Sequence, residues 1–133
     1  MTVFCLGSEQ VDNLWPEYAH HLERLERKGL ILAEAVRADL KAADKQLWGY
    51  QHEGRVLGIA ITSVIDTPRG KAVEVYGAAG TESVHGQIDQ IMAEIERWAA
   101  ALGCTRVRIL GRKGWLRRLH GYRQTGIIIE KDL

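Results

Sequence analysis

Apolar residues recur every three or four positions in three stretches of the chain, which predicts three amphipathic helices. The first stretch covers residues 11–28 and the second covers residues 31–43. The third and longest covers residues 84–102, and Gly103 follows it in the position favoured for a left-handed helix cap. These three segments are the expected helical part of the fold.

Elsewhere the period of the pattern shortens to two, or the chain carries short apolar runs between turn residues, which predicts strands. The predicted strands are residues 2–6, two antiparallel strands within 45–65 joined at Glu53–Gly54, and residues 72–76, 106–110 and 122–131. The last of these contains Ile127, Ile128 and Ile129 and is expected to close the sheet, after a short helix at residues 115–120. A strand, a long helix and a strand in succession indicate two parallel neighbouring strands with a right-handed crossover.

Composition is ordinary for a soluble globular protein. The 133 residues are 46% hydrophobic and 26% charged, and they suffice for a single domain over residues 1–133. No run approaches the roughly 20 apolar residues of a membrane span, and the N-terminus lacks the pattern of a secretory signal. We therefore expect a cytoplasmic protein without a membrane partner, and the distant Cys5 and Cys104 are expected to be reduced thiols.

A net charge of +1 conceals a basic C-terminal region, residues 103–129, which holds seven Arg or Lys residues and no Asp or Glu. Such segregation favours an anionic partner: a phosphate-bearing cofactor, an acidic protein surface or a nucleic acid, of which we rank the nucleic acid last. A solvated basic face that binds nothing is the alternative. Five histidines show no ligand-like spacing, so no metal site is expected.

The order of elements resembles that of the GNAT N-acetyltransferase superfamily. The segments that carry the resemblance are QLWGYQHEGRVLGIAITSV, GKAVEVYGAAG, IERWAAALGC and GRKGWLRRLHGYRQTGIIIEKDL, and they are similar to small GNAT-like proteins of tailed bacteriophages and prophages. The resemblance implies an α/β (α+β) fold in three layers, with a mixed central sheet of about six strands and helices on both faces. It also implies a phage or host protein as a partner, and a place in the host cytoplasm or the virion.

For the cofactor, the resemblance implies acetyl-CoA between strands 72–76 and 106–110, with its pyrophosphate on the backbone of the loop that opens the long helix. The implied cofactor-binding residues are Val75, Tyr76, Gly77, Ala78, Ala79, Gly80 and Thr81, together with Arg112 and Arg117 of the basic C-terminal region. The family's loop pattern is Q/R-x-x-G-x-G/A, whereas this chain has Gly77 in the first position and Glu82 in the last. A strand-to-helix connection that binds no nucleotide is therefore the alternative.

Acetyl transfer to an amine needs a base and an acid. Glu74 is the best-placed carboxylate for the base, and its alternative is a strand residue paired with a Lys or Arg. The family's general acid is a tyrosine four residues before the glycine that corresponds to Gly121, and this chain has Arg117 there. An arginine cannot give up a proton at neutral pH. Tyr76 and Tyr122 are substitutes by residue type, although both also fit core aromatics.

The sequence thus supports two hypotheses. One is an acetyl-CoA-dependent N-acetyltransferase whose acceptor is not specified by the residues. The other is a catalytically inactive protein of the same fold that serves as a structural or interaction component of a phage.

Overall fold

The computed structural model describes residues 2–80, 88–111 and 113–133. Its elements, in chain order, are β1 (Thr2–Cys5), η1 (Ser8–Gln10), α1 (Val11–Arg27), α2 (Ala33–Lys41), β2 (Gln46–His52), β3 (Arg55–Thr67), β4 (Gly70–Gly80), α3 (Ile88–Ala101), β5 (Arg106–Ile109) and η3 (Lys113–Arg117). The three predicted helices and the first five predicted strands are therefore present, although residues 84–87 of the third predicted helix lie outside the described residues. The short helix after β5 is a 3-10 turn that begins earlier than the sequence predicts.

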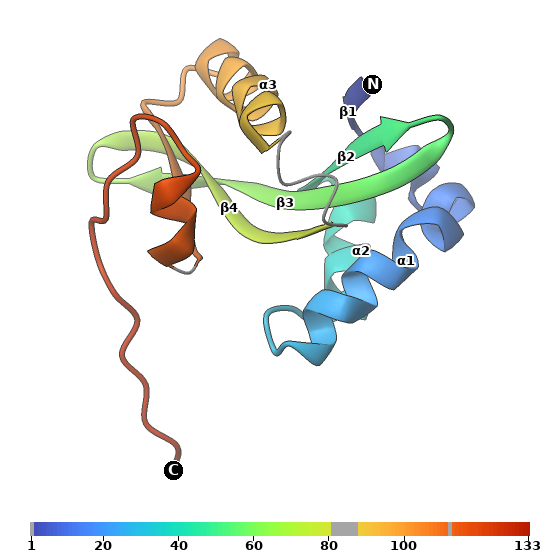
Figure 1. Ribbon diagram of the computed structural model, residues 1–133, viewed down its shortest axis with the longest axis horizontal. Helices are drawn as coiled ribbons and strands as arrows, with labels where there is room; N and C mark the ends of the chain where they lie inside the picture. The colour runs from blue at the N-terminus through green and yellow to red at the C-terminus, as the bar shows by residue number, and fades with distance from the viewer. Residues whose placement is uncertain (1, 81–87, 112) are drawn as a thin grey trace.

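The five strands form a single mixed sheet in the order β1-β2-β3-β4-β5. The first three pairings are antiparallel, whereas β4 and β5 are parallel. α1 and α2 cover one face of the sheet and α3 covers the other, so the chain has three layers (Figure 1). The strand-helix-strand unit predicted for β4, α3 and β5 is confirmed.

Each face of the sheet holds its own apolar core, because each helix turns its apolar stripe inward. On the α1 side, Tyr18 and Leu22 of α1 pack with Ile61 of β3, and each is at most 1% exposed. On the α3 side, Ile95 of α3 packs with Val73 of β4 in a second cluster, and both are fully buried. Two cores built on one sheet explain how a short chain buries three helices.

The prediction of a sixth strand is wrong for the residues that the structure describes. The segment 122–131 has no regular structure, and Ile127, Ile128 and Ile129 are 72%, 73% and 84% exposed. Three consecutive apolar residues predict a tendency to extend, but a strand forms only where an edge is within reach to pair with it. Here Gly121, at φ +81°, is followed by a tail that runs away from the sheet (Figure 1).

Among the described residues, no helix is long and apolar enough to cross a lipid bilayer.

Candidate active site

The parallel strands β4 and β5, at the edge of the sheet, separate midway along β4. β4 pairs with β3 over its whole length, Gly70–Gly80, but with β5 only from Ala72 to Val75. The last contact is a hydrogen bond of 2.9 Å from the Leu110 amide to the Val75 carbonyl. From Tyr76 to Gly80 the outer edge of β4 has no strand partner among the described residues. Such an edge can bind an extended ligand by strand-like hydrogen bonds.

A β-bulge lies where this open edge begins. Val75 is opposite Thr62 and Gly77 is opposite Ile61, so Tyr76 is an extra residue on β4. Val75 and Ala78 both pack on the α3 side, and Tyr76 and Ala79 both pack on the α1 side. Strict alternation from Val75 would have placed Ala78 and Ala79 on the opposite faces. The bulge therefore moves the side chains that follow it on β4 to the opposite face of the sheet. Bulges of this kind are common beside active sites.

The predicted cofactor loop is largely part of this strand. Gly77, Ala78, Ala79 and Gly80 belong to β4, so the prediction of a loop over them is wrong, while Thr81 lies outside the described residues. A Cβ on Gly77 would lie 3.2 Å from Cδ1 of Ile61 and 3.4 Å from Cδ1 of Leu25. The small residues thus allow α1 to pack closely on the bulge. Composition alone does not distinguish this role from that of a flexible turn.

Glu74 lies on β4 directly opposite Arg108 of β5, and the two form an ion pair. Oε2 of Glu74 is 2.6 Å from Nη2 and 2.7 Å from Nε of Arg108. The Glu74 side chain is 15% exposed and that of Arg108 is 47% exposed. The pairing with an arginine is the arrangement that the sequence offered as the alternative to a catalytic base.

Tyr76, the bulge residue, lies on the same side of the sheet as Lys45, which precedes β2. The Nζ atom of Lys45 is 4.7 Å from the centre of the Tyr76 ring and 3.0 Å from Oδ2 of Asp39. The Tyr76 hydroxyl is buried without a hydrogen-bond partner among the described residues. Burial raises the pKa of Tyr76, and the Lys45 ammonium opposes part of that rise. The open edge therefore begins at a tyrosine whose hydroxyl is protonated and has no hydrogen-bond partner among the described residues.

Tyr122, the other candidate acid, is placed differently. It packs against the core on the α3 side, and its hydroxyl donates a hydrogen bond of 3.2 Å to Oε1 of Glu96. Burial, followed by the Glu96 charge, raises the pKa of Tyr122 above its usual range. Tyr122 thus stays protonated, and its proton is held by a carboxylate of α3.

A cation that the sequence does not single out lies at the end of β4. Arg24 of α1 donates a hydrogen bond of 3.1 Å from Nη1 to the carbonyl of Gly80. Arg24 and Lys45 are distant in sequence from β4, and only the packing of α1 and α2 on the sheet brings them to it.

Of the predicted phosphate ligands, Arg117 is exposed at the end of η3 and Arg112 lies outside the described residues. Trp115 of η3 packs against the α3-side core.

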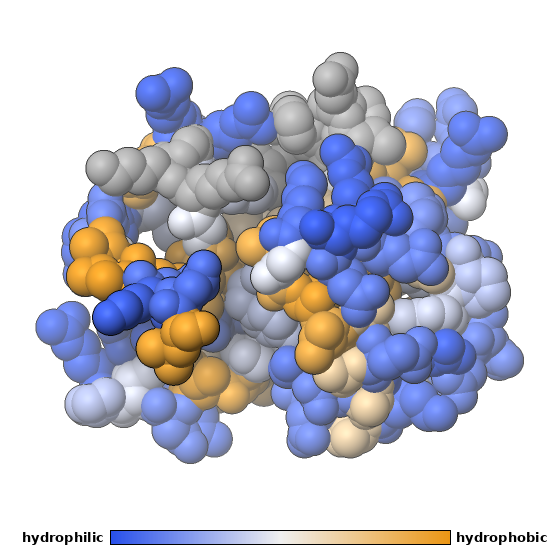
Figure 2. Space-filling view, turned by 90° about the horizontal axis from the view of Figure 1, so that it is seen from below, coloured by the Kyte–Doolittle hydropathy of each residue, from blue (hydrophilic) through white to orange (hydrophobic). Residues whose placement is uncertain are grey.

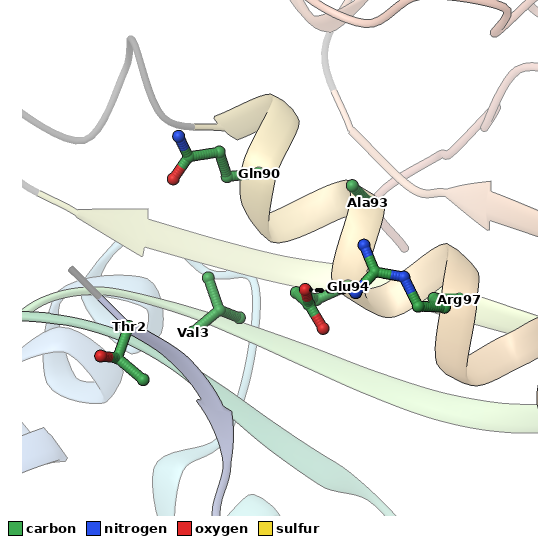
Figure 3. Close-up of a pocket in the computed structure, with 6 residues that line it drawn as sticks. All are labelled: Thr2, Val3, Gln90, Ala93, Glu94 and Arg97. Atoms are coloured by element: carbon green, nitrogen blue, oxygen red, sulfur yellow. Dashed lines mark hydrogen bonds and ion pairs between the residues drawn. The ribbon is translucent and has the colours of Figure 1, made fainter.

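Two other features do not belong to this site. A hollow of about 400 Å³ lies between β1 and α3, at the opposite edge of the sheet, and Glu94 and Arg97 pair within it (Figure 3). His21 is buried, and its Nε2 donates to the Val56 carbonyl at 3.0 Å. No group of three potential metal-ligating side chains is found in the described part of the chain.

Comparison with known proteins shows similarity in fold and not in sequence. The chain matches no protein-family model, and no curated protein is similar to it in sequence. Many solved structures share its fold. A probable acetyltransferase has a TM-score of 0.74 at 14% identity, over 100% of this chain and 97% of that one.

Two further matches carry more specific descriptions. An aminoglycoside acetyltransferase from an uncultured soil metagenomic sample, solved with sisomicin, has a TM-score of 0.76 at 10% identity, over 99% of this chain and 95% of that one. A predicted acetyltransferase from Clostridium acetobutylicum, solved with acetyl-CoA, has a TM-score of 0.64 at 12% identity, over 98% and 95% of the two chains. The fold is therefore one found in acetyltransferases, as the resemblance to the GNAT superfamily implies.

Proposed function

We propose that the protein is an acetyl-CoA-dependent N-acetyltransferase and that the open edge of β4, from Tyr76 to Gly80, is its cofactor-binding strand. The observation that carries the proposal is the coincidence of that edge with the bulge, in a fold found in acetyltransferases. The pantetheine arm of acetyl-CoA is extended and carries amide groups, so it suits an unpaired strand edge. When bound, acetyl-CoA supplies an acetyl thioester whose C–S bond breaks as a C–N bond to the acceptor amine forms.

The reaction needs a proton taken from the amine and a proton given to the leaving sulfur. We assign the first task to Glu74, which lies two residues before the bulge on the same face as Tyr76 and pairs with Arg108. We assign the second to Tyr76, because its hydroxyl is protonated and without a partner in the described structure. Tyr122, the other tyrosine suggested by the sequence, has its hydroxyl engaged by Glu96.

The phosphates of the cofactor need cations near the end of β4. We assign this role to Arg24, since its Nη1 donates to the Gly80 carbonyl and its other donors make no hydrogen bond with a described residue. Arg112, Arg117 and Thr81 remain predictions for the same role. The acceptor in this proposal is an amine of unspecified identity, and the phage origin and virion role also remain predictions of the sequence.

Calorimetric titration with acetyl-CoA tests the proposal. We expect binding in the micromolar range, about −8 kcal/mol. Arg24→Gln should weaken binding several-fold, whereas Arg27→Gln, one turn further along the exposed face of α1, should not. Release of free thiol in the presence of an amine such as sisomicin then reports turnover. Absence of binding at saturating acetyl-CoA would contradict the proposal.

A second candidate function is a catalytically inactive protein that uses the same fold to bind a partner. Three observations favour it: Arg117 occupies the family's tyrosine position, Gly77 serves to pack α1 on the sheet, and Glu74 is engaged in an ion pair. This candidate predicts neither acetyl-CoA binding nor thiol release, so the same titration separates the two.

A further inference from the structure

The C-terminal tail, residues 123–133, presents an apolar segment to solvent. Ile127, Ile128 and Ile129 are 72%, 73% and 84% exposed, and no strand pairs with them in the described structure. Consecutive β-branched residues favour extended backbone and are costly to leave in water. The tail leaves the body of the molecule beside η3, and its end lies well away from the sheet (Figure 1). Seen from below, the molecule shows apolar surface in separate patches among polar side chains (Figure 2).

The sheet, for its part, ends in an open edge. β5 pairs with β4 on one side, and no described strand pairs with its other side. Thr105, which precedes β5, donates its amide to the Lys71 carbonyl of the β4 side. Because backbone groups alternate in direction along a strand, the amides and carbonyls of Arg106 and Arg108 point toward the open edge. Such an edge is a template for another strand.

The side-chain pattern of the edge matches that of the tail. On β5, Val107 and Ile109 pack on the α3 side, whereas Arg106 and Arg108 lie on the opposite face. An extended tail would place Ile127 and Ile129 on one face, and Ile128, Glu130 and Asp132 on the other. Paired in this register, apolar residues meet apolar residues, and the two carboxylates lie on the face of the two arginines.

Among the described residues, Arg106 in particular has no carboxylate partner. Its Nη2 donates to Oγ1 of Thr67 at 2.7 Å, its Nε is buried without a hydrogen bond, and no carboxylate of the described chain lies within ion-pair distance. A partly buried guanidinium of this kind is stabilised when an anion reaches it. A carboxylate at this edge would therefore be stabilised by Arg106.

We propose that the tail of one copy adds to the β5 edge of a second copy as a sixth strand, reciprocally, in a twofold-symmetric dimer. A second copy suits the geometry because the tail already points away from its own sheet, while pairing with its own edge would require the chain to reverse. The exchange would cover Ile127 and Ile129 with apolar side chains and would pair the open edge of β5 in both copies. Exchange of an identical element is a low-cost route to a dimer. The sixth strand that the sequence predicts is then supplied by the partner.

Light scattering after size exclusion tests this directly. The wild-type protein is expected to have about twice the 14.9 kDa of one chain. The double variant I127D/I129D should be a monomer, and its circular dichroism should be unchanged because the tail lies outside both cores. The matched control L30D/L32D alters two leucines that are 54% and 70% exposed in the connection between α1 and α2, and it should remain a dimer.

A charge variant tests the register. E130K/D132K should weaken dimerisation roughly tenfold by removing the anions that face Arg106 and Arg108. A monomeric wild-type protein would overturn the proposal. This holds both for a tail that is free and cleaved by protease and for a tail that is protected because it folds onto the β5 edge of its own chain. A dimer that persists in I127D/I129D would also overturn it. None of these outcomes depends on acetyl-CoA binding.

Discussion

The ammonium of Lys45 lies 4.7 Å from the centre of the Tyr76 ring, on the face of the sheet that α1 and α2 cover. Asp39 holds that ammonium at 3.0 Å, so the cation is fixed beside the one residue that bulges from β4. A fixed positive charge close to a phenol stabilises the phenolate that remains after proton transfer. The pair thus has the property that the general acid of the proposed reaction needs.

Replacing Tyr76 by phenylalanine removes the hydroxyl and keeps the ring over Lys45. We expect Tyr76→Phe to lower turnover by about 100-fold, the usual size of a general-acid contribution. Binding of acetyl-CoA should change little, because the ring and the backbone edge remain. Tyr122→Phe is the control, since its hydroxyl is bonded to Glu96. Equal losses of turnover in the two variants would contradict the assignment.

The role of Glu74 can be separated from that of its ion pair. Glu74→Gln should lower turnover by about 100-fold if the carboxylate is the base. Arg108→Gln breaks the same pair but leaves the carboxylate, so its turnover should remain within a few-fold of wild type. Each change should cost at most about 1 kcal/mol of stability, because Arg108 is about half exposed. The same loss of turnover in both variants would mean that the pair is only structural.

Buried His21 makes stability depend on pH. Burial lowers its pKa, and the carbonyl of Val56 accepts a hydrogen bond from Nε2 at 3.0 Å. The folded state therefore favours the neutral ring, while the unfolded chain takes up a proton near its ordinary pKa of about 6.5. The stabilisation is complete above that value and is lost as the pH falls toward the lowered folded pKa.

Urea unfolding on both sides of about pH 6.5 measures this effect. His21→Gln can still donate to the Val56 carbonyl but does not titrate, so its unfolding free energy should depend less on pH. His20→Gln, on the neighbouring residue, should keep the wild-type dependence. An unaltered dependence in His21→Gln would show that another group is responsible.

The periodicity of the sequence predicted most of the fold, because apolar stripes and alternation are local properties of the chain. The parallel pairing of β4 with β5 followed from a strand, a helix and a strand in succession. The bulge at Tyr76 could not be predicted in this way, since it is defined by a register with β3. The approach of Lys45 and Arg24 depends on how two helices pack on the sheet, so neither residue stood out as part of a site.

Glycine and alanine in the stretch 77–80 predicted a loop for a similar reason. Their small size is compatible with a tight turn, and it is equally compatible with a strand on which a helix packs closely. Which of the two applies is decided by the partners, here Ile61 and Leu25. The tail shows the converse, because Ile127–Ile129 has the composition of a strand but pairs with no strand in the described part of the chain.

Gly77 provides the last test, because its role in packing predicts a loss of stability. A Cβ there would lie 3.2 Å from Cδ1 of Ile61 and 3.4 Å from Cδ1 of Leu25, and valine would add two further methyl groups to this contact. We expect Gly77→Val to lower the free energy of unfolding by about 1–3 kcal/mol through overpacking. Gly126→Val, at a tail position with nothing within 4 Å of a Cβ, should leave it unchanged. Urea unfolding compares the two variants, and equal stabilities would mean that α1 can move away from the bulge at no cost.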